Sequence, residues 1–244
     1  RTWRSGRQMN RLLQGDVGSG KTAVAEVAMY KAVRGGYQAV MMAPTEILAH
    51  QHFEGLEKSF AVHGIRVGFL SGSLKASEKR ETLERLKNGE IDILVGTHAV
   101  IQPEVEFANL GLVITDEQHR FGVNQRIQLK EKGKNPNILV MTATPIPRTL
   151  AVVLYGDLDV SVIDEMPPGR QVIKTRNLNG EKRDACYDFV EKQLQQGRQA
   201  YVVTPLIEDS ETLDLKSAQT VYEELAERFA AYNVALIHGG MKQA

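Results

Sequence analysis

Eight residues near the start of the chain have the types and the spacing needed to hold phosphate. They fit the pattern G-x-x-x-x-G-K followed by Ser or Thr, as Gly15, Asp16, Val17, Gly18, Ser19, Gly20, Lys21 and Thr22. Glycines allow a tight turn whose backbone N–H groups reach phosphate oxygens. Lys21 supplies a positive charge for the β- and γ-phosphates, and Thr22 supplies a hydroxyl for Mg²⁺. The pattern predicts binding of ATP together with Mg²⁺.

A second group of reactive side chains follows an apolar run later in the chain. The run covers residues 112–115, and Asp116 and Glu117 come directly after it. An acidic residue at the carboxyl end of a buried strand is the usual Mg²⁺ partner of a phosphate loop. We therefore expect Asp116 to bind Mg²⁺ and Glu117 to act as the base that polarises the attacking water. Without a phosphate loop in the same chain, the pair would read equally well as two solvated carboxylates.

These side chains need a scaffold, which the alternation of apolar runs with helical stretches predicts. The expected strands are residues 11–14, 37–42, 65–70, 91–95, 111–115 and 138–141. The expected helices between them are residues 23–34, 46–60 and 76–87. Unbroken Val, Ile and Leu runs separated by helices are typical of a parallel sheet covered on both faces.

A second, shorter series of elements follows a break in the chain. Two prolines and a glycine in residues 164–170 predict a domain boundary, because these residues interrupt regular structure. Beyond it we expect strands at residues 172–175, 200–204 and 234–237, with helices at residues 181–196 and 218–230. The acidic residues 208–214 are expected to form a mobile surface loop.

Four short motifs occur in the order that superfamily 2 helicases have, each directly after an expected strand. Asp116 and Glu117 continue into Gln118 and His119, a sequence similar to the DEAD and DEAH boxes. The others are residues 43–49, which resemble P-T-x-x-L, residues 95–98, which resemble the G-T motif, and residues 141–145, which resemble the S/T-A-T motif. Each motif is weak alone, but their shared order indicates a helicase.

Longer stretches resemble the RecG family of branched-DNA helicases. They are residues 12–22, 116–123, 142–150 and 155–165, and the last is followed by Pro-Pro-Gly-Arg. The resemblance implies an α/β fold: a RecA-like P-loop NTPase domain with a parallel sheet flanked by helices, followed by the truncated start of a second RecA-like domain. The implied domains are residues 1–164, with an incomplete N-terminal edge, and residues 172–244, joined by a linker at 165–171.

The same resemblance implies roles for the motif residues. RecG-like proteins hydrolyse ATP to move on double-stranded DNA and to remodel stalled forks and Holliday junctions in recombination and repair. Gln118 is then a nucleotide contact and His119 a catalytic residue. With Thr142 and Thr144, which couple hydrolysis to movement, they form a polar relay between the γ-phosphate and DNA.

Contacts with DNA are implied at two other strand ends. The residues are Pro44, Thr45, Gly96 and Thr97. Short hydroxyl side chains and backbone N–H groups can hold phosphates there without reading bases, which suits a motor that moves over any sequence. Ordinary strand-exit turns are the structural alternative for these residues.

The chain lacks other parts of the RecG pattern. The branch-splitting wedge, the upstream glutamine motif that reads adenine and the arginine finger of the second domain have no match in it. We expect a fragment of a longer protein that binds nucleotide weakly and has no helicase activity of its own, whereas its parent is an ATP-dependent DNA helicase.

Other functions stay open at this point. A transcription-repair coupling translocase is the runner-up, although that family usually has Phe at the position of Ser19 and Glu at that of Gln118. A phosphate-loop kinase for a small molecule and a non-catalytic nucleotide- or DNA-binding module are alternatives from other classes.

Composition adds few constraints. The 30 basic and 30 acidic residues give a net charge of zero, which neither indicates nor excludes DNA binding. A single cysteine, Cys186, permits no intrachain disulfide and fits a reducing compartment. The sequence has no apolar stretch long enough to cross a membrane. We expect a cytoplasmic motor that works as a monomer without a membrane partner. The spacing of the histidines predicts no structural metal site.

Overall fold

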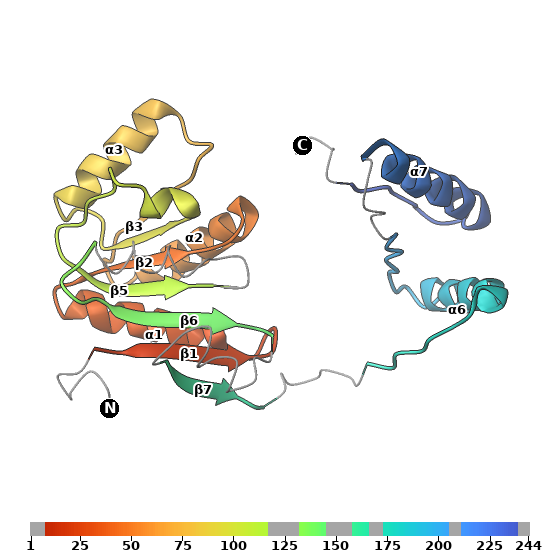
Figure 1. Ribbon diagram of the computed structural model, residues 1–244, viewed down its shortest axis with the longest axis horizontal. Helices are drawn as coiled ribbons and strands as arrows, with labels where there is room; N and C mark the ends of the chain where they lie inside the picture. Colours follow the sequence, from red (N-terminus) through yellow and green to blue (C-terminus); the bar gives the residue numbers. More distant parts are fainter. Residues whose placement is uncertain (1–7, 117–131, 145–157, 166–172, 205–210, 239–244) are drawn as a thin grey trace. The chain divides into compact units, whose positions relative to one another are not determined.

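Seven parallel strands form the centre of the first of two units into which the chain divides, Arg1–Gln171 and Val172–Ala244 (Figure 1). The structure, a computed structural model, describes residues 8–116, 132–144, 158–165, 173–204 and 211–238. The strands are β1 (Asn10–Gly15), β2 (Gln38–Met42), β3 (Val67–Leu70), β4 (Ile93–Gly96), β5 (Leu110–Thr115), β6 (Asn137–Thr142) and β7 (Asp159–Ile163). Their order is β3-β4-β2-β5-β6-β1-β7. The predicted parallel sheet is confirmed.

Burial on both faces explains why the central strands read as unbroken apolar runs. Neighbouring residues of a strand point to opposite faces. In β5, Leu112 and Ile114 belong to one apolar cluster and Val113 to the other. Both clusters are closed to solvent, so a polar side chain on either face costs free energy unless it finds a hydrogen-bond partner.

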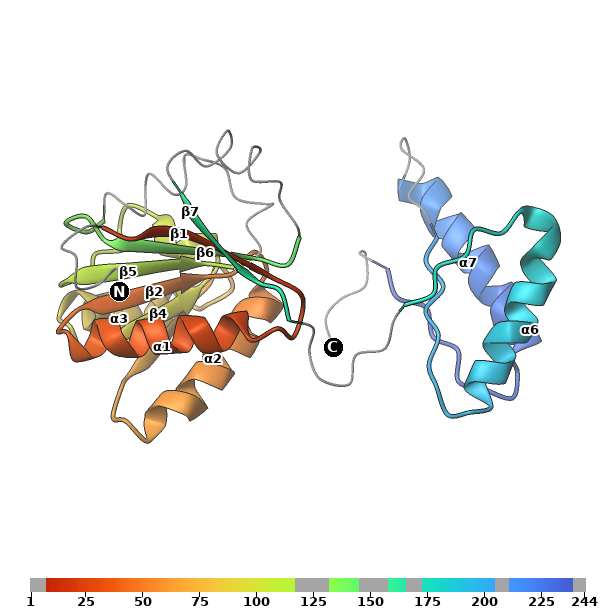
Figure 2. The same ribbon diagram turned by 90° about the horizontal axis from the view of Figure 1, so that it is seen from below.

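Two helices cover one face of this sheet and a third covers the other. Helices α1 (Lys21–Arg34) and α2 (Glu46–Ala61) lie on the same face (Figure 2). Helix α3 (Ala76–Lys87) and the short 3₁₀ helix η2 (His98–Ile101) pack on the opposite face through the other cluster. Buried residues recur every three or four positions in α1, which is the spacing of one helical face: Ala25, Met29 and Ala32.

One polar side chain is buried where the sheet begins. Gln38, at the start of β2, is 6% exposed. Its Nε2 donates to the carbonyl oxygens of Leu86 at 2.9 Å and Ile91 at 2.8 Å. Its Oε1 accepts from the backbone N–H of Asn109 at 2.9 Å. The pairing of β2 with β5 shifts register at Gln38, so a side chain takes over hydrogen bonding of backbone groups in three other segments.

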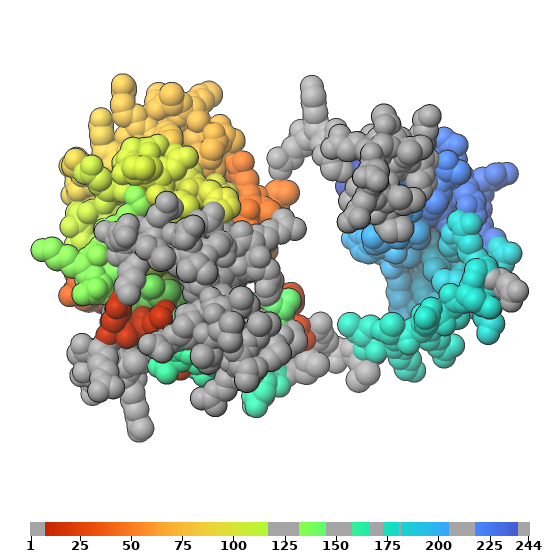
Figure 3. Space-filling model, viewed as in Figure 1, coloured from red at the N-terminus to blue at the C-terminus, as the bar shows by residue number. Residues whose placement is uncertain are grey.

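Ion pairs join α3 to the segment that follows β4. Lys79 pairs with Glu104 at 3.1 Å and Lys87 with Glu106 at 2.7 Å. In the space-filling view, α3 in yellow and this segment in yellow-green form adjoining surface (Figure 3). The charged face of the helix therefore has partners within the chain, and exposed pairs of this kind stabilise a fold only weakly.

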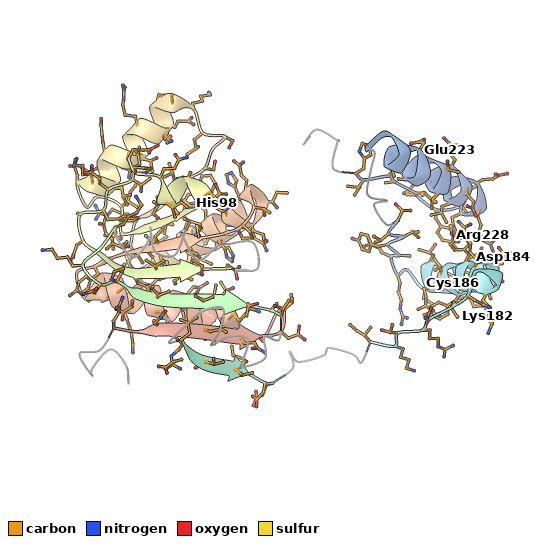
Figure 4. The ribbon with its side chains drawn as sticks, in the orientation of Figure 1. His98, Lys182, Asp184, Cys186, Glu223 and Arg228 are labelled. Atoms are coloured by element: carbon orange, nitrogen blue, oxygen red, sulfur yellow. The ribbon has the colours of Figure 1, made fainter. Side chains whose placement is uncertain are left out.

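The second unit has a small core between two helices. Its elements are the 3₁₀ helix η4 (Gly180–Lys182), α6 (Arg183–Leu194) and α7 (Glu211–Arg228). Tyr187, Leu225 and Phe229 form the buried cluster. Beside it, Arg228 of α7 pairs with Asp184 of α6 at 3.0 Å (Figure 4). These contacts hold the two helices together.

The prediction of strands in this second unit was wrong for the residues that the structure describes. Residues 173–175, 200–204 and 234–237 carry no strand. Tyr201 and Val203 are each 87% exposed and Ile237 is 84% exposed. A strand needs neighbours that pair with its backbone and cover its side chains, and a run of apolar residues specifies neither. The expected domain boundaries stay a prediction.

Residues 211–214, expected in a mobile loop, instead open α7, and this expectation was also wrong. Acidic residues are favourable in the first turn of a helix, since the backbone dipole is positive there. The composition that suggested a loop is therefore equally compatible with a helix start. The preceding residues 205–210 lie outside the described part of the chain.

Candidate nucleotide and nucleic-acid site

The predicted site residues gather at one edge of the sheet. Parallel strands end at the same edge, as the arrowheads in Figure 1 show, and ligands bind there in open α/β sheets. From β4 through β2, β5 and β6 to β1, the groups at or just after the strand ends are Gly96 with Thr97, Pro44 with Thr45, Asp116, Thr142 with Thr144, and the phosphate loop. The expected DNA contacts thus stand on neighbouring strands, while β6 separates the two strands of the nucleotide site.

The phosphate loop joins the end of β1 to the start of α1. Gly18 and Gly20 have positive φ angles of 79° and 92°. A Cβ atom on Gly20 would meet nothing within 4 Å, so glycine is needed there for its backbone conformation and not for space. The Ser19 N–H donates to the Asp16 carbonyl at 3.1 Å and closes the turn.

Charge in this loop suits an anion. The Lys21 ammonium donates to the carbonyl oxygens of Gly15 at 2.7 Å and Asp16 at 2.9 Å, which holds it beside the loop. The first turn of α1, residues 21–24, contains no acidic residue. Its backbone N–H groups and the positive end of the helix dipole therefore act together with Lys21. These features fit a bound phosphate chain.

Asp116 is held firmly at the end of β5. Its backbone N–H donates to the Met42 carbonyl of β2 at 2.9 Å. Its carboxylate Oδ2 lies 2.8 Å from Nε2 of His52, and both side chains are largely buried, at 13% and 12% exposed. Within the described residues no group of three or more His, Cys, Asp and Glu side chains could form a metal cage. Mg²⁺ needs no such cage when phosphates and one carboxylate supply its ligands, so Asp116 and the Thr22 hydroxyl are a suitable donor set.

The expected coupling residues lie between the two halves of the nucleotide site. Thr142, fully buried at the end of β6, has its Oγ1 atom 3.1 Å from Oγ1 of Thr144. The same Thr142 oxygen accepts from the Thr144 backbone N–H at 3.2 Å. The two hydroxyls therefore form one unit. Glu117, Gln118 and His119 lie outside the described residues, so the rest of the predicted relay has no geometry here.

Thr45, one of the predicted DNA contacts, has a structural task in addition to its predicted one. It is the N-cap of α2, and its Oγ1 accepts from the Leu48 backbone N–H at 3.3 Å. A Thr at this position satisfies one of the unpaired N–H groups at a helix start. Pro44, directly before it, connects β2 to this cap.

Gly96 has a packing reason to be glycine. A Cβ atom there would lie 2.0 Å from the Leu70 carbonyl oxygen of β3, closer than any side chain can approach. The Thr97 N–H donates to this same carbonyl at 3.3 Å, and the Gly96 carbonyl accepts from Ala43 at 2.9 Å. The G-T pair is thus built into the sheet edge, and its contact with DNA stays a prediction.

Sequence reasoning missed a cluster next to these residues. The Glu46 carboxylate, in the first turn of α2, accepts from the hydroxyl of Ser73 and, at 2.8 Å, from that of Ser71. These hydrogen bonds, that of Ser73 first, hold the pKa of Glu46 below its usual value. Ser71 follows β3 as the predicted residues follow their strands, so applying the strand-end rule to residues 65–70 would have found it.

His52 was also missed as a site residue, because sequence reasoning considered it only as a metal ligand. Its neighbour His50 points elsewhere and stacks on Phe69, with ring centroids 4.1 Å apart. A usable signal existed in the helical spacing: His52 is three residues after Ala49 and four before Leu56, and both of these are buried.

Comparison with known proteins gives a consistent set of similarities. A family model described as DEAD/DEAH box helicase matches residues 2–153. The chain is 58% identical over 240 residues to the ATP-dependent DNA helicase RecG of Streptococcus pneumoniae, covering 98% of this chain and 36% of the relative. It is also 58% identical over 233 residues to RecG of Bacillus subtilis, covering 95% and 34%. The chain therefore spans about a third of the length of these relatives.

Solved structures agree with this result. The structure of RecG bound to a three-way DNA junction has a TM-score of 0.74 and 47% identity, and the match covers 92% of this chain and 29% of that one. The Hef helicase domain of Pyrococcus furiosus has a TM-score of 0.54 at 19% identity, with 90% and 52% covered, which supports the fold alone. In the described part of the chain, no helix combines the length and apolar character needed to span a membrane.

Proposed function

Because the chain belongs to the DEAD/DEAH box helicase family, we propose that it is part of the motor of an ATP-dependent DNA helicase that remodels branched DNA. The observation that carries the proposal is the shared sheet edge, where a phosphate loop and Asp116 flank β6 and the P-T and G-T residues follow β2 and β4. The similarity to RecG proteins extends over nearly the whole chain. Stalled forks and Holliday junctions are the proposed substrates, in recombination and repair.

The chain would bind ATP through the phosphate loop and Mg²⁺ through Thr22 and Asp116. When bound, Mg²⁺ neutralises phosphate charge during phosphoryl transfer. Lys21 would bind the β- and γ-phosphates, and the N–H groups of the loop would hold their oxygens. Glu117 is proposed as the base that orients water, with Gln118 and His119 as nucleotide contact and catalytic partner.

Contacts with DNA are proposed at Pro44, Thr45, Gly96 and Thr97. Support comes from their position on adjacent strands, next to the nucleotide site and not within it. Thr142 and Thr144 would relay between the two, because β6 ends between the strands that carry the phosphate loop and Asp116. Binding through phosphates explains how such a motor could work on any sequence.

The proposed organisation is a first RecA-like domain over residues 1–164, a linker at 165–171 and the beginning of a second such domain over 172–244. The motor would act as a monomer on branched double-stranded DNA in the cytoplasm, where bacterial DNA lies. The transcription-repair coupling alternative is not favoured, since the relatives above are RecG helicases.

The test is ATP hydrolysis by the intact protein with forked and with linear duplex DNA. We expect stimulation that is greater with the fork, and Lys21→Ala should lower the stimulated rate by about 100-fold or more, since a charge aimed at the transferred phosphate is lost. Exposed Lys31→Ala in the same helix is the matched control. Phosphate transfer to a small acceptor without any DNA stimulation would instead identify a kinase.

The chain on its own provides a second measurement. Residues 1–244 alone should bind nucleotide weakly and hydrolyse it at only a trace of the intact protein's rate, because the proposed arginine finger belongs to other parts of the motor. Turnover close to that of the intact protein would contradict this expectation.

A further inference from the structure

His52 connects helix α2 to the carboxylate of Asp116. None of the roles proposed for the motif residues involves this contact. The two side chains are 64 residues apart in sequence, yet Nε2 and Oδ2 are 2.8 Å apart. An ionised carboxylate can only accept a hydrogen bond, so Nε2 must be the donor. Such a bond restricts the orientation of the carboxylate. Because both side chains are largely buried, water competes little for this hydrogen bond.

The helix that carries His52 is itself anchored at several points. Leu56 and Phe60 pack into the apolar cluster on one face of the sheet, and Ala49 is also buried. At its start, the Thr45 cap and the hydrogen bonds of Glu46 to two serine hydroxyls fix the first turn. The imidazole is therefore presented by a rigid element, as a group that orients another side chain must be.

We infer that His52 is a positioning residue, which holds the Asp116 carboxylate in the orientation that binds the magnesium–nucleotide complex. The inference rests on the proposed function, because it takes Asp116 as the Mg²⁺ carboxylate. His52 itself touches neither metal nor nucleotide in this role. Residues that hydrogen-bond to metal ligands commonly contribute about 10- to 100-fold in metal affinity. Without such a residue, the carboxylate must be ordered at each binding event.

The experiment measures Mg²⁺-dependent binding of a fluorescent, non-hydrolysable ATP analogue to the intact protein. His52→Leu removes the donor and should raise the Mg²⁺ concentration for half-maximal binding by about 10-fold. Binding of the analogue in excess chelator should not change. His52→Gln should stay near wild type, because its amide N–H can donate from a similar position. His50→Leu, on the same helix but stacked on Phe69, is the matched control and should also match wild type.

Several outcomes would overturn the inference. An unchanged Mg²⁺ curve for His52→Leu would mean that the contact does not orient the carboxylate, and a lower Mg²⁺ requirement would mean that the histidine competes with the metal. Equal loss of binding with and without Mg²⁺ would indicate a purely structural role. If His52→Leu does not fold, His52→Phe keeps a planar ring without a donor and is read in the same way.

One further variant separates this inference from the proposed function. Asp116→Asn should itself weaken Mg²⁺-dependent binding strongly. If it does so while His52→Leu does not, the inference fails and the nucleotide site stands. If wild type binds no analogue, or Asp116→Asn behaves as wild type, the proposed nucleotide site fails first.

Discussion

Replacing Gln38 by Leu tests whether a single buried amide secures the sheet that carries the site. The change replaces a polar side chain by an apolar one of similar size and removes a partner from three backbone groups, the carbonyls of Leu86 and Ile91 and the N–H of Asn109. Leu86 lies in α3, and Ile91 and Asn109 lie just before β4 and β5. Leucine cannot hydrogen-bond to any of them. The Leu86 carbonyl still accepts from the Gly89 N–H at 3.1 Å, so the loss falls on the Ile91 carbonyl and the Asn109 N–H.

The size of the effect follows from these contacts. Each buried polar group left without a partner costs about 1–3 kcal/mol. Burial of the leucine side chain offsets about 1.5–3 kcal/mol. Two groups cost about 2–6 kcal/mol before this offset, so the expected net loss in free energy of unfolding is about 2 kcal/mol at mid-range, a sizeable share of the roughly 5–15 kcal/mol that holds a typical domain together.

Hydrogen exchange read on separate peptides is the suitable assay, because unfolding of a protein with several units gives no single free energy. Amides of β2, β4 and β5 should exchange faster in Gln38→Leu, while those of α6 and α7 should not change. Gln51→Leu, on the exposed side of α2, is the control and should leave protection as in wild type. Unchanged protection of β2 in Gln38→Leu would refute the accounting, since it would mean that the Ile91 carbonyl and the Asn109 N–H find other partners.

Two further predictions concern the site and its surroundings. Thr144→Ala in the intact protein should leave nucleotide binding unchanged but lower DNA unwinding per ATP hydrolysed, measured with a forked duplex, because the hydroxyl pair with Thr142 is lost; equal loss of binding and unwinding would argue against a relay. Burial favours neutral Asp92, but hydrogen bonds from the Arg66 side chain and backbone hold the pKa of Asp92 below its ordinary value. The stability this gives is present above the unfolded pKa of about 3.9 and is lost as pH falls through the lower folded value. Arg66→Leu should therefore lower the protection of β3 and β4 amides from hydrogen exchange at neutral pH and approach wild type in acid; a constant difference across a pH series would contradict this.

The strands of the first unit were predictable because the burial of most of them on both faces is visible in their sequence. Residues such as 112–114 are apolar without interruption, which only a strand covered on both faces requires. The phosphate loop and Asp116 could be located by the same means, since each follows such a run. Strand β7 could not, because Asp159–Ile163 is half-exposed and alternates polar with apolar residues, as an edge strand does.

Contacts between distant segments were beyond the reach of sequence patterns. The bond of His52 to Asp116 depends on how α2 crosses the sheet, and the bonds of Gln38 depend on a shift in strand register. In the second unit, apolar runs such as residues 201–203 predicted strands for which the described residues provide no neighbours. Local sequence records whether a segment is suited to a strand, whereas pairing is decided by the whole sheet.

The place of β1 in the sheet sets the order in which the nucleotide site can form. β1 comes first in the chain, yet its two neighbours are β6 and β7, and Gly15 at the base of the phosphate loop pairs with Ile163. During synthesis at roughly 5–20 residues per second, β1 must wait on the order of ten seconds before both partners have left the ribosome. Until then its backbone edges are exposed to other chains. Nucleotide binding would thus be among the last properties that a nascent first unit acquires, although its signature motif precedes the other strands of the sheet in the chain.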